Sequence, residues 1–281
     1  MKKYPFLRAC WLVVDLLLAF AVIAVVYSIG WEFSTRSYLK GFSDAIIPAS
    51  GDPVQKIEAI LQWMAHGPAR RSAADPGGLQ DRNPEDTLNI QQLLEVCGTA
   101  TNAFVNLAQS SGLHARRLLL LDERGQSKHV VVETLVGDRW AVVDPSWHVL
   151  LRLPDGHLPT HTELKDPAVF RSATQSIPNY PQSYTYEKTV HVRLRRIPLI
   201  GDVLRRIFDF AWPSWEESIN WTLLVERESF AMLTISILIL GFALATRILL
   251  GWYCSGRLGL ARVRLRDQIV RAGHVLVGSS R

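Results

Sequence analysis

Cys97 is one of three cysteines in the chain, and it lies in a polar middle region without a second cysteine to pair with. The other two lie in or beside long apolar runs near the two ends. His129 and Asp144 follow Cys97 along the chain. A thiol, an imidazole and a carboxylate can form a nucleophilic triad, in which the imidazole activates the thiol and the carboxylate orients the imidazole. These three side chains are therefore the first candidates for chemistry.

The segment that carries Cys97 has the pattern of an amphipathic helix. Residues 96–110 place small and apolar side chains at helical spacing, and Gly112 suits the position that ends such a helix. Cys97 then occupies the first turn, where the helix dipole and the unpaired amides favour a thiolate. The backbone N–H of Cys97 is also placed to contribute to an oxyanion hole.

Three strand-like runs follow this helix, over residues 115–121, 129–136 and 139–147. Gly137 and Asp138 suit a two-residue type II′ turn between the last two runs. In the register that this turn sets, His129 and Asp144 are diagonal neighbours on one face, within reach of a hydrogen bond. A three-residue loop would change the parity and separate them. Glu133 shares that face, and we interpret it as a structural charge.

The remaining segments between the apolar ends are less regular. Residues 53–66 have helical spacing, whereas residues 67–87 are rich in Gly, Pro, Asp and Arg and are typical of a surface loop. Residues 151–188 show no period and are expected to be loops around the domain. His157 and His161 lie in this region without helical spacing or further ligands, so no metal site is predicted.

Two stretches, "VCGTATNAFVNLAQSSGLHARR" and "HVVVETLVGDRWAVVDPSW", contain Cys–Gly, a strand-opening His and Asp–Pro in that order. In these features residues 55–147 resemble the transglutaminase-like superfamily of papain-related fold. The resemblance implies an α+β core in which the helix bearing Cys97 packs on an antiparallel sheet. It implies a Cys97–His129–Asp144 triad and a thioester intermediate. Gln91, six residues before the cysteine, has the offset of the oxyanion-hole glutamine in papain-like enzymes. No calcium-loop signature is present, so neither a metal nor another cofactor is implied.

Two apolar runs, about residues 9–31 and 230–253, are each long enough to cross roughly 30 Å of hydrocarbon. Basic residues precede the first run and follow the second, which places both termini in the cytoplasm and the middle of the chain on the far side. The first run exceeds a usual signal-peptide core and lacks a nearby cleavage site, so we expect a retained anchor. The sequence therefore predicts a two-pass protein of the bacterial inner (cell) membrane with an extracytoplasmic domain.

The predicted organisation has seven parts: a cytoplasmic N-terminus (1–8), a transmembrane helix (9–31), a linker (32–52), a transglutaminase-like domain (53–188), a juxtamembrane amphipathic segment (189–229), a second transmembrane helix (230–253) and a basic cytoplasmic tail (254–281). The juxtamembrane segment suits either a helix in the membrane interface or a scaffold helix packed on the domain. Asp15 and Arg247 both lie toward the cytoplasmic ends of the spans and can pair if the spans pack.

The net charge of +5 owes much to the basic tail, and no nucleic-acid motif accompanies it, so nucleic acid is not expected as a partner. The expected substrate is a protein or peptide amide. Because the bacterial proteins that the domain resembles are often hydrolases, we expect a protease or amidase rather than a crosslinking transglutaminase. The alternative is a non-catalytic binding or scaffolding module of a membrane-associated envelope or polysaccharide assembly, with a membrane-complex partner. The intact Cys, His and Asp set favours the enzyme.

Overall fold

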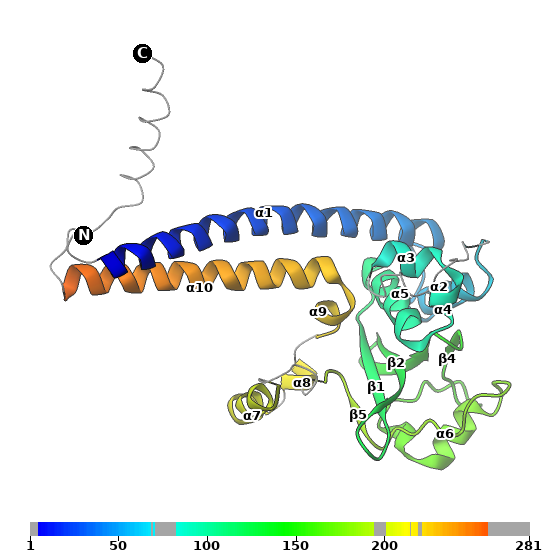
Figure 1. Ribbon diagram of the computed structural model, residues 1–281. Coiled ribbons are helices and arrows are strands. Elements are labelled where there is room, and N and C mark those ends of the chain that lie inside the picture. Colours follow the sequence, from blue (N-terminus) through cyan, green and yellow to red (C-terminus); the bar gives the residue numbers. More distant parts are fainter. Residues whose placement is uncertain are drawn as a thin grey trace. The chain divides into compact units, whose positions relative to one another are not determined.

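The computed structural model describes residues 5–68, 70, 83–193, 201–213, 215–218 and 221–257 (Figure 1). The chain divides into two compact units. One unit comprises Met1–Gly30 and Met232–Arg281, and the other comprises Trp31–Ala231.

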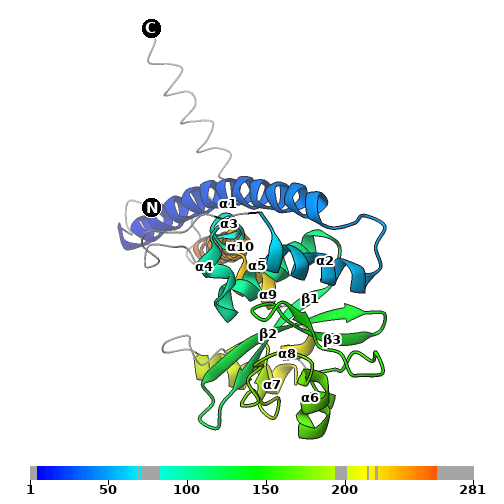
Figure 2. The ribbon, with the colours of Figure 1, turned by 90° about the vertical axis from the view of Figure 1, so that its right-hand side faces the viewer.

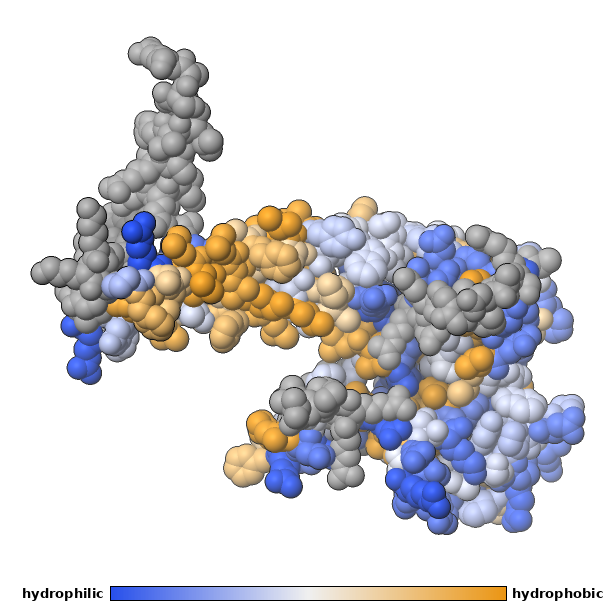
Figure 3. Space-filling model, in the orientation of Figure 1, coloured by the Kyte–Doolittle hydropathy of each residue, from blue (hydrophilic) through white to orange (hydrophobic). Residues whose placement is uncertain are grey.

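The first unit holds most of two long helices, α1 (Pro5–Ile46) and α10 (Glu228–Gly256). Both are long and apolar enough to cross a membrane by length and composition, and Figure 3 shows the orange, hydrophobic side chains along them. Two polar contacts join the helices within this unit. Arg247 Nε donates to Asp15 Oδ1 at 2.7 Å, a pairing that the sequence left open, and the Ser28 and Ser236 hydroxyls lie 3.2 Å apart.

The structure corrects the predicted linker over residues 32–52, because α1 continues without a break as far as Ile46. Two i,i+4 ion pairs, between Arg36 and Glu32 and between Lys40 and Asp44, support this extension. A third feature is apolar: Leu39 is buried and packs in the core of the second unit. The sequence did not predict a helix over residues 32–46, because most of these residues are polar.

Four helices lead to the sheet, namely α2 (Pro53–His66), α3 (Pro84–Asn89), α4 (Gln91–Leu94) and α5 (Cys97–Ser110). The start of α2 is fixed by a capping box between Asp52 and Gln55, and its bounds match the predicted helix. The surface loop predicted over residues 67–87 is wrong at its C-terminal end, because helix α3 begins at Pro84 and Asn83 is its N-cap. As predicted, α5 ends before Gly112, whose φ of +85° suits glycine.

A five-stranded antiparallel sheet follows, in the order β4-β3-β2-β1-β5. Its strands are β1 (Ala115–Leu121), β2 (Ser127–Val136), β3 (Arg139–Asp144), β4 (Val149–Leu150) and β5 (Thr189–Val190). The turn between β2 and β3 has two residues, because Val136 pairs with Arg139. Gly137 adopts a φ of +64°, which accounts for glycine at this position. The predicted register is therefore confirmed.

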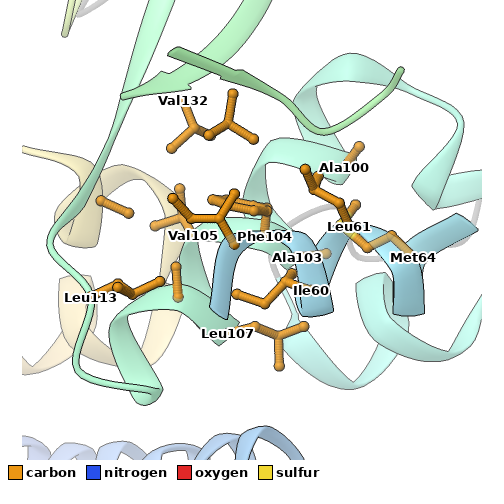
Figure 4. Close-up of a cluster of buried hydrophobic side chains, with 14 of the residues drawn as sticks. Ile60, Leu61, Met64, Ala100, Ala103, Phe104, Val105, Leu107, Leu113 and Val132 are labelled. Carbon is orange, nitrogen blue, oxygen red and sulfur yellow. The ribbon is translucent and has the colours of Figure 1, made fainter. Parts of the chain in front are cut away.

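The two faces of the sheet are covered by different parts of the chain (Figure 2). Helices α2 and α5 cover one face, where Phe104 and Ile60 pack with Val132 of β2 (Figure 4). On the other face, Val131 packs with residues from the 151–186 segment, including Phe170 of helix α6 (Pro167–Thr174). The alternation along β2 is that of a strand buried on both sides. The segment expected to be loops thus also contains α6 and a short 3₁₀ turn, Glu163–Lys165.

Three further helices precede α10: α7 (Gly201–Ala211), α8 (Trp215–Ser218) and α9 (Thr222–Glu226). Phe208 of α7 stacks on Trp215, and Trp221 packs edge-on to both. The opposite face of α7 exposes apolar side chains, with Phe210 93% exposed. An amphipathic α7 fits the expected juxtamembrane segment, and its contact with a membrane stays a prediction. The predicted tail lies outside the described residues beyond residue 257.

Candidate active site

The candidate nucleophile lies at the N-terminus of α5. Cys97 is the first residue of the helix and is partly buried. Its position is set by the packing of α5 on β2, where Thr101 Oγ1 donates to the Val130 carbonyl at 3.4 Å. The N–H groups of the first turn of α5 have no partner within the helix, and the positive end of the helix dipole lies at the same place. Both favour a thiolate at Cys97.

His129 and Asp144 meet on the sheet as the hairpin register predicts. His129 Nε2 lies 2.7 Å from Asp144 Oδ2, and both side chains are buried. With Nε2 engaged by the carboxylate, Nδ1 is the ring nitrogen left for Cys97. The pKa of the Cys97 thiol is lowered chiefly by its interaction with the His129 side chain, which places the thiol close to the imidazole.

The electrostatics of this group favour a thiolate–imidazolium pair. The pKa of Cys97 lies below its ordinary value, chiefly because of the hydrogen bond with His129 and also through the backbone of Val130. Burial opposes this shift. The pKa of His129 is raised to about 9: burial alone would lower it, but the hydrogen bonds and charges of Asp144 and Cys97 outweigh that effect. Each partner thus stabilises the charged form of the other.

Asp144 accepts hydrogen bonds at both carboxylate oxygens. Oδ2 accepts from the Tyr180 hydroxyl at 2.8 Å in addition to His129. Oδ1 accepts from the Ser146 hydroxyl at 2.8 Å and from the Ser146 backbone N–H at 3.2 Å. Four donors on a carboxylate with no exposed surface fix its orientation and hence that of the His129 ring.

Aromatic side chains complete the surroundings of His129. The Tyr184 ring stacks on the imidazole, with ring centroids 4.1 Å apart and 9° between planes. Tyr180 packs at right angles to Tyr184. Sequence reasoning missed both tyrosines, because they come from the aperiodic 151–188 segment. The signal that could have drawn attention to them is the cluster of tyrosines in "NYPQSYTY".

Gln91, the candidate oxyanion donor, is the first residue of α4. Its Nε2 lies 3.4 Å from Glu95 Oε1, and its Oε1 lies 3.3 Å from Arg70 Nη1. Both contacts are long for hydrogen bonds, so the amide is weakly held. The predicted role of Gln91 in an oxyanion hole stays a prediction.

Glu133 lies on β2 with no exposed surface and binds three cationic or titratable side chains. Oε1 is 2.6 Å from His161 Nδ1, while Oε2 is 2.9 Å from His191 Nε2 and 2.8 Å from Arg116 Nε. Arg116 also stacks over the Trp140 ring, 4.0 Å from its centroid. These contacts tie β1, β2, the covering segment and β5 together, which fits the interpretation of Glu133 as a structural charge.

Within the described residues, no group of three or more His, Cys, Asp or Glu side chains is arranged to hold a metal ion. His157 lies 3.3 Å from Glu163 Oε1, and His161 binds Glu133, so each of these two histidines contacts a different carboxylate.

The helix that begins at Cys97 packs on an antiparallel sheet that carries His129 and Asp144, so this part of the chain is an α+β domain. Residues 40–145 match the family model described as the transglutaminase-like superfamily. This part of the chain is therefore a transglutaminase-like domain. Searches of curated proteins and of solved structures give no significant match.

Proposed function

We propose that the protein is a membrane-anchored, extracytoplasmic cysteine hydrolase that cleaves amide bonds of proteins or peptides through Cys97, His129 and Asp144. The observation that carries this proposal is the His129–Asp144 contact at 2.7 Å, on an imidazole that also lowers the pKa of Cys97. The match to the transglutaminase-like superfamily adds support, because that superfamily generally comprises cysteine enzymes.

The first half of the reaction forms the thioester. The Cys97 sulfur attacks the carbonyl carbon of the amide, and the negative charge that develops on the oxygen is stabilised by the Cys97 backbone N–H, with Gln91 as the second candidate donor. The His129 imidazolium then gives a proton to the amide nitrogen as the carbon–nitrogen bond breaks. The amine leaves, and the acyl group stays on sulfur.

The second half returns the free enzyme. Neutral His129 takes a proton from a water molecule, whose oxygen attacks the thioester carbonyl, and Cys97 leaves as a thiolate paired with the imidazolium. Asp144 keeps its position throughout and holds the ring in the required orientation. An amine in place of water would produce transamidation instead. We favour hydrolysis, because the bacterial proteins that the domain resembles are often hydrolases.

Membrane anchoring is supported by the two apolar helices α1 and α10 and by the charges around them. Lys2, Lys3 and Arg8 precede the first span and six arginines follow the second, whereas the residues just before the second span are partly acidic. By the positive-inside rule this supports cytoplasmic termini and an extracytoplasmic domain in a bacterial inner membrane.

The proposal predicts cleavage of peptide amides by the full-length protein in detergent. A library of fluorogenic peptide aminocoumarin amides should yield aminocoumarin with the wild type and none with Cys97→Ala. Incorporation of dansylcadaverine into casein, measured in parallel, should be absent. Casein labelling that depends on Cys97 would replace hydrolysis with transamidation. A wild type inactive in both assays would contradict the enzyme and favour the scaffolding module.

A further inference from the structure

A hollow in the Trp31–Ala231 unit is lined by residues of α1, by the end of α5 and the turn after it, and by α9. Its volume is about 520 Å³, roughly that of seventeen water molecules. Its cationic lining side chains are Arg36 and Lys40 of α1 and Arg227, the residue between α9 and α10, and His114 lies beside them. No carboxylate is among its lining residues.

Two of the three cations at this hollow share a single carboxylate: Lys40 pairs with Asp44, whereas Arg36 and Arg227 both contact Glu32. Glu32 is buried and serves two arginines: its Oε1 lies 2.5 Å from Arg36 Nε and 3.3 Å from Arg227 Nη1. Its other oxygen accepts from the Ser229 hydroxyl at 2.7 Å. One carboxylate thus faces two guanidinium groups, and Arg227 is only 5% exposed. Arg227 is nearly buried and shares with Arg36 the one carboxylate that it contacts among the described residues, Glu32. Such a site favours the binding of a further anion.

The position of Arg227 is itself fixed. Its Nε donates to Asn106 Oδ1 at 3.0 Å, and Asn106 is a fully buried residue of α5. Arg36 and Lys40, in contrast, are largely exposed on the same side of α1, one helical turn apart. The hollow therefore has a rigid cationic wall and two adaptable cationic side chains at its mouth.

The location relative to the apolar spans points to a lipid ligand. No charged residue lies between Asp15 and Glu32, or between Glu228 and Arg247. Arg36 follows Trp31 by five residues, which is about 8 Å along a helix, and a headgroup layer is about 5–8 Å thick. Leu113 and Leu223 add apolar surface to the wall.

We propose that this hollow binds the phosphate of an anionic phospholipid headgroup in the leaflet that faces the domain. The inference rests on the membrane placement in the proposed function but not on the amidase activity. The phosphate would lie between Arg36, Lys40 and the wall formed by Arg227, with the glycerol and first methylenes against the two leucines. A phosphate ion alone would leave most of the 520 Å³ unfilled.

Native mass spectrometry of the full-length protein, released from nanodiscs of equal parts phosphatidylglycerol and phosphatidylcholine, tests this site. The wild type should retain phosphatidylglycerol preferentially. The Arg36→Gln/Lys40→Gln double variant should lose that preference about thirtyfold, because each surface cation contributes roughly a fivefold attraction to anionic lipid. Lys165→Gln/Arg171→Gln removes two exposed charges elsewhere in the domain and should retain the preference.

Equal retention by the wild type and the Arg36→Gln/Lys40→Gln variant would overturn the proposal, as would an equal loss in the Lys165→Gln/Arg171→Gln control. Displacement of the lipid by an excess of inorganic phosphate would assign the hollow to a soluble phosphate and reject the lipid. Peptide-amide cleavage should be unchanged in both double variants. If cleavage fails in the wild type while the lipid preference holds, the enzyme proposal falls and the lipid site stands.

Discussion

Asp144→Asn is expected to lower the turnover of a peptide amide by about 10³–10⁴-fold while leaving the domain folded. Asparagine keeps the shape of the side chain and can still accept from Ser146. It replaces one carboxylate oxygen by an NH₂ group that cannot accept the His129 proton at 2.7 Å, and it removes the charge that helps to raise the pKa of His129 to about 9. The ring is then free to adopt the wrong tautomer and orientation.

The matched control is Ser146→Ala. It removes the 2.8 Å hydroxyl donor to the other carboxylate oxygen but leaves the contacts of Asp144 with His129 and Tyr180 in place. Its turnover should fall by at most about 10–150-fold, since one hydrogen bond to a charged group contributes about 1.5–3 kcal/mol and three donors to the carboxylate remain. Initial rates with the best aminocoumarin peptide, and near-UV circular dichroism of both variants, provide the comparison. Equal turnover of Asp144→Asn and the wild type would remove Asp144 from the catalytic group.

Glu133→Gln is expected to destabilise the domain by about 3–5 kcal/mol, because it removes the charge that compensates buried cationic partners. The carboxylate has no exposed surface and binds Arg116, His161 and His191 at 2.6–2.9 Å. For a domain of this size the midpoint of thermal unfolding should fall by about 10 °C. Circular dichroism of the full-length protein in detergent measures this shift.

The pH dependence of this effect has a definite sign. Burial alone would raise the pKa of Glu133, but hydrogen bonds from His161 and His191 and the charge of Arg116 hold it far below its usual range. A depressed carboxyl pKa contributes stability above the unfolded-state value of about 4.3, and that contribution is lost as the pH falls toward the folded-state value. The difference between the wild type and Glu133→Gln should therefore be largest above about pH 5 and shrink below about pH 4.

Glu163→Gln is the control for this prediction, because Glu163 also binds a guanidinium and a histidine, Arg139 and His157, but at the surface. An exposed ion pair contributes at most about 1 kcal/mol. The Glu163 variant should therefore unfold within a few degrees of the wild type. If both variants unfolded at the same temperature, Glu133 would not be the structural charge that ties the covering segment to the sheet.

The contact between His129 and Asp144 was predictable because one short turn determines it. The two-residue connection at Gly137 and Asp138 sets the parity of β2 and β3, and parity alone decides whether His129 and Asp144 share a face. The helical period of α5 placed Cys97 at a helix start in the same way. Such local patterns carry most of the information about this part of the fold.

The partners of these residues were not predictable, because they come from aperiodic chain or from distant elements. Tyr180 and Tyr184 reach the His–Asp pair from a segment without secondary-structure periodicity. The contacts of Glu133 fit its interpretation as a structural charge, yet nothing in the sequence pairs it with His191, the residue that follows β5. The extension of α1 through residues 32–46 was also missed, since its apolar residues contact a core that only the folded chain assembles.

The most direct test of the thiolate–imidazolium pair is the pH profile of Cys97 alkylation by iodoacetamide. It is measured on the full-length chain with Cys10→Ser and Cys254→Ser, with and without His129→Ala. The pKa of Cys97 is lowered by His129, and the pKa of His129 is raised to about 9. The reaction should therefore stay fast below pH 7 with His129 present, and require a pH above about 8.5 in the His129→Ala variant. Slow, alkaline-only labelling in both proteins would contradict the pair and leave Cys97 an ordinary thiol.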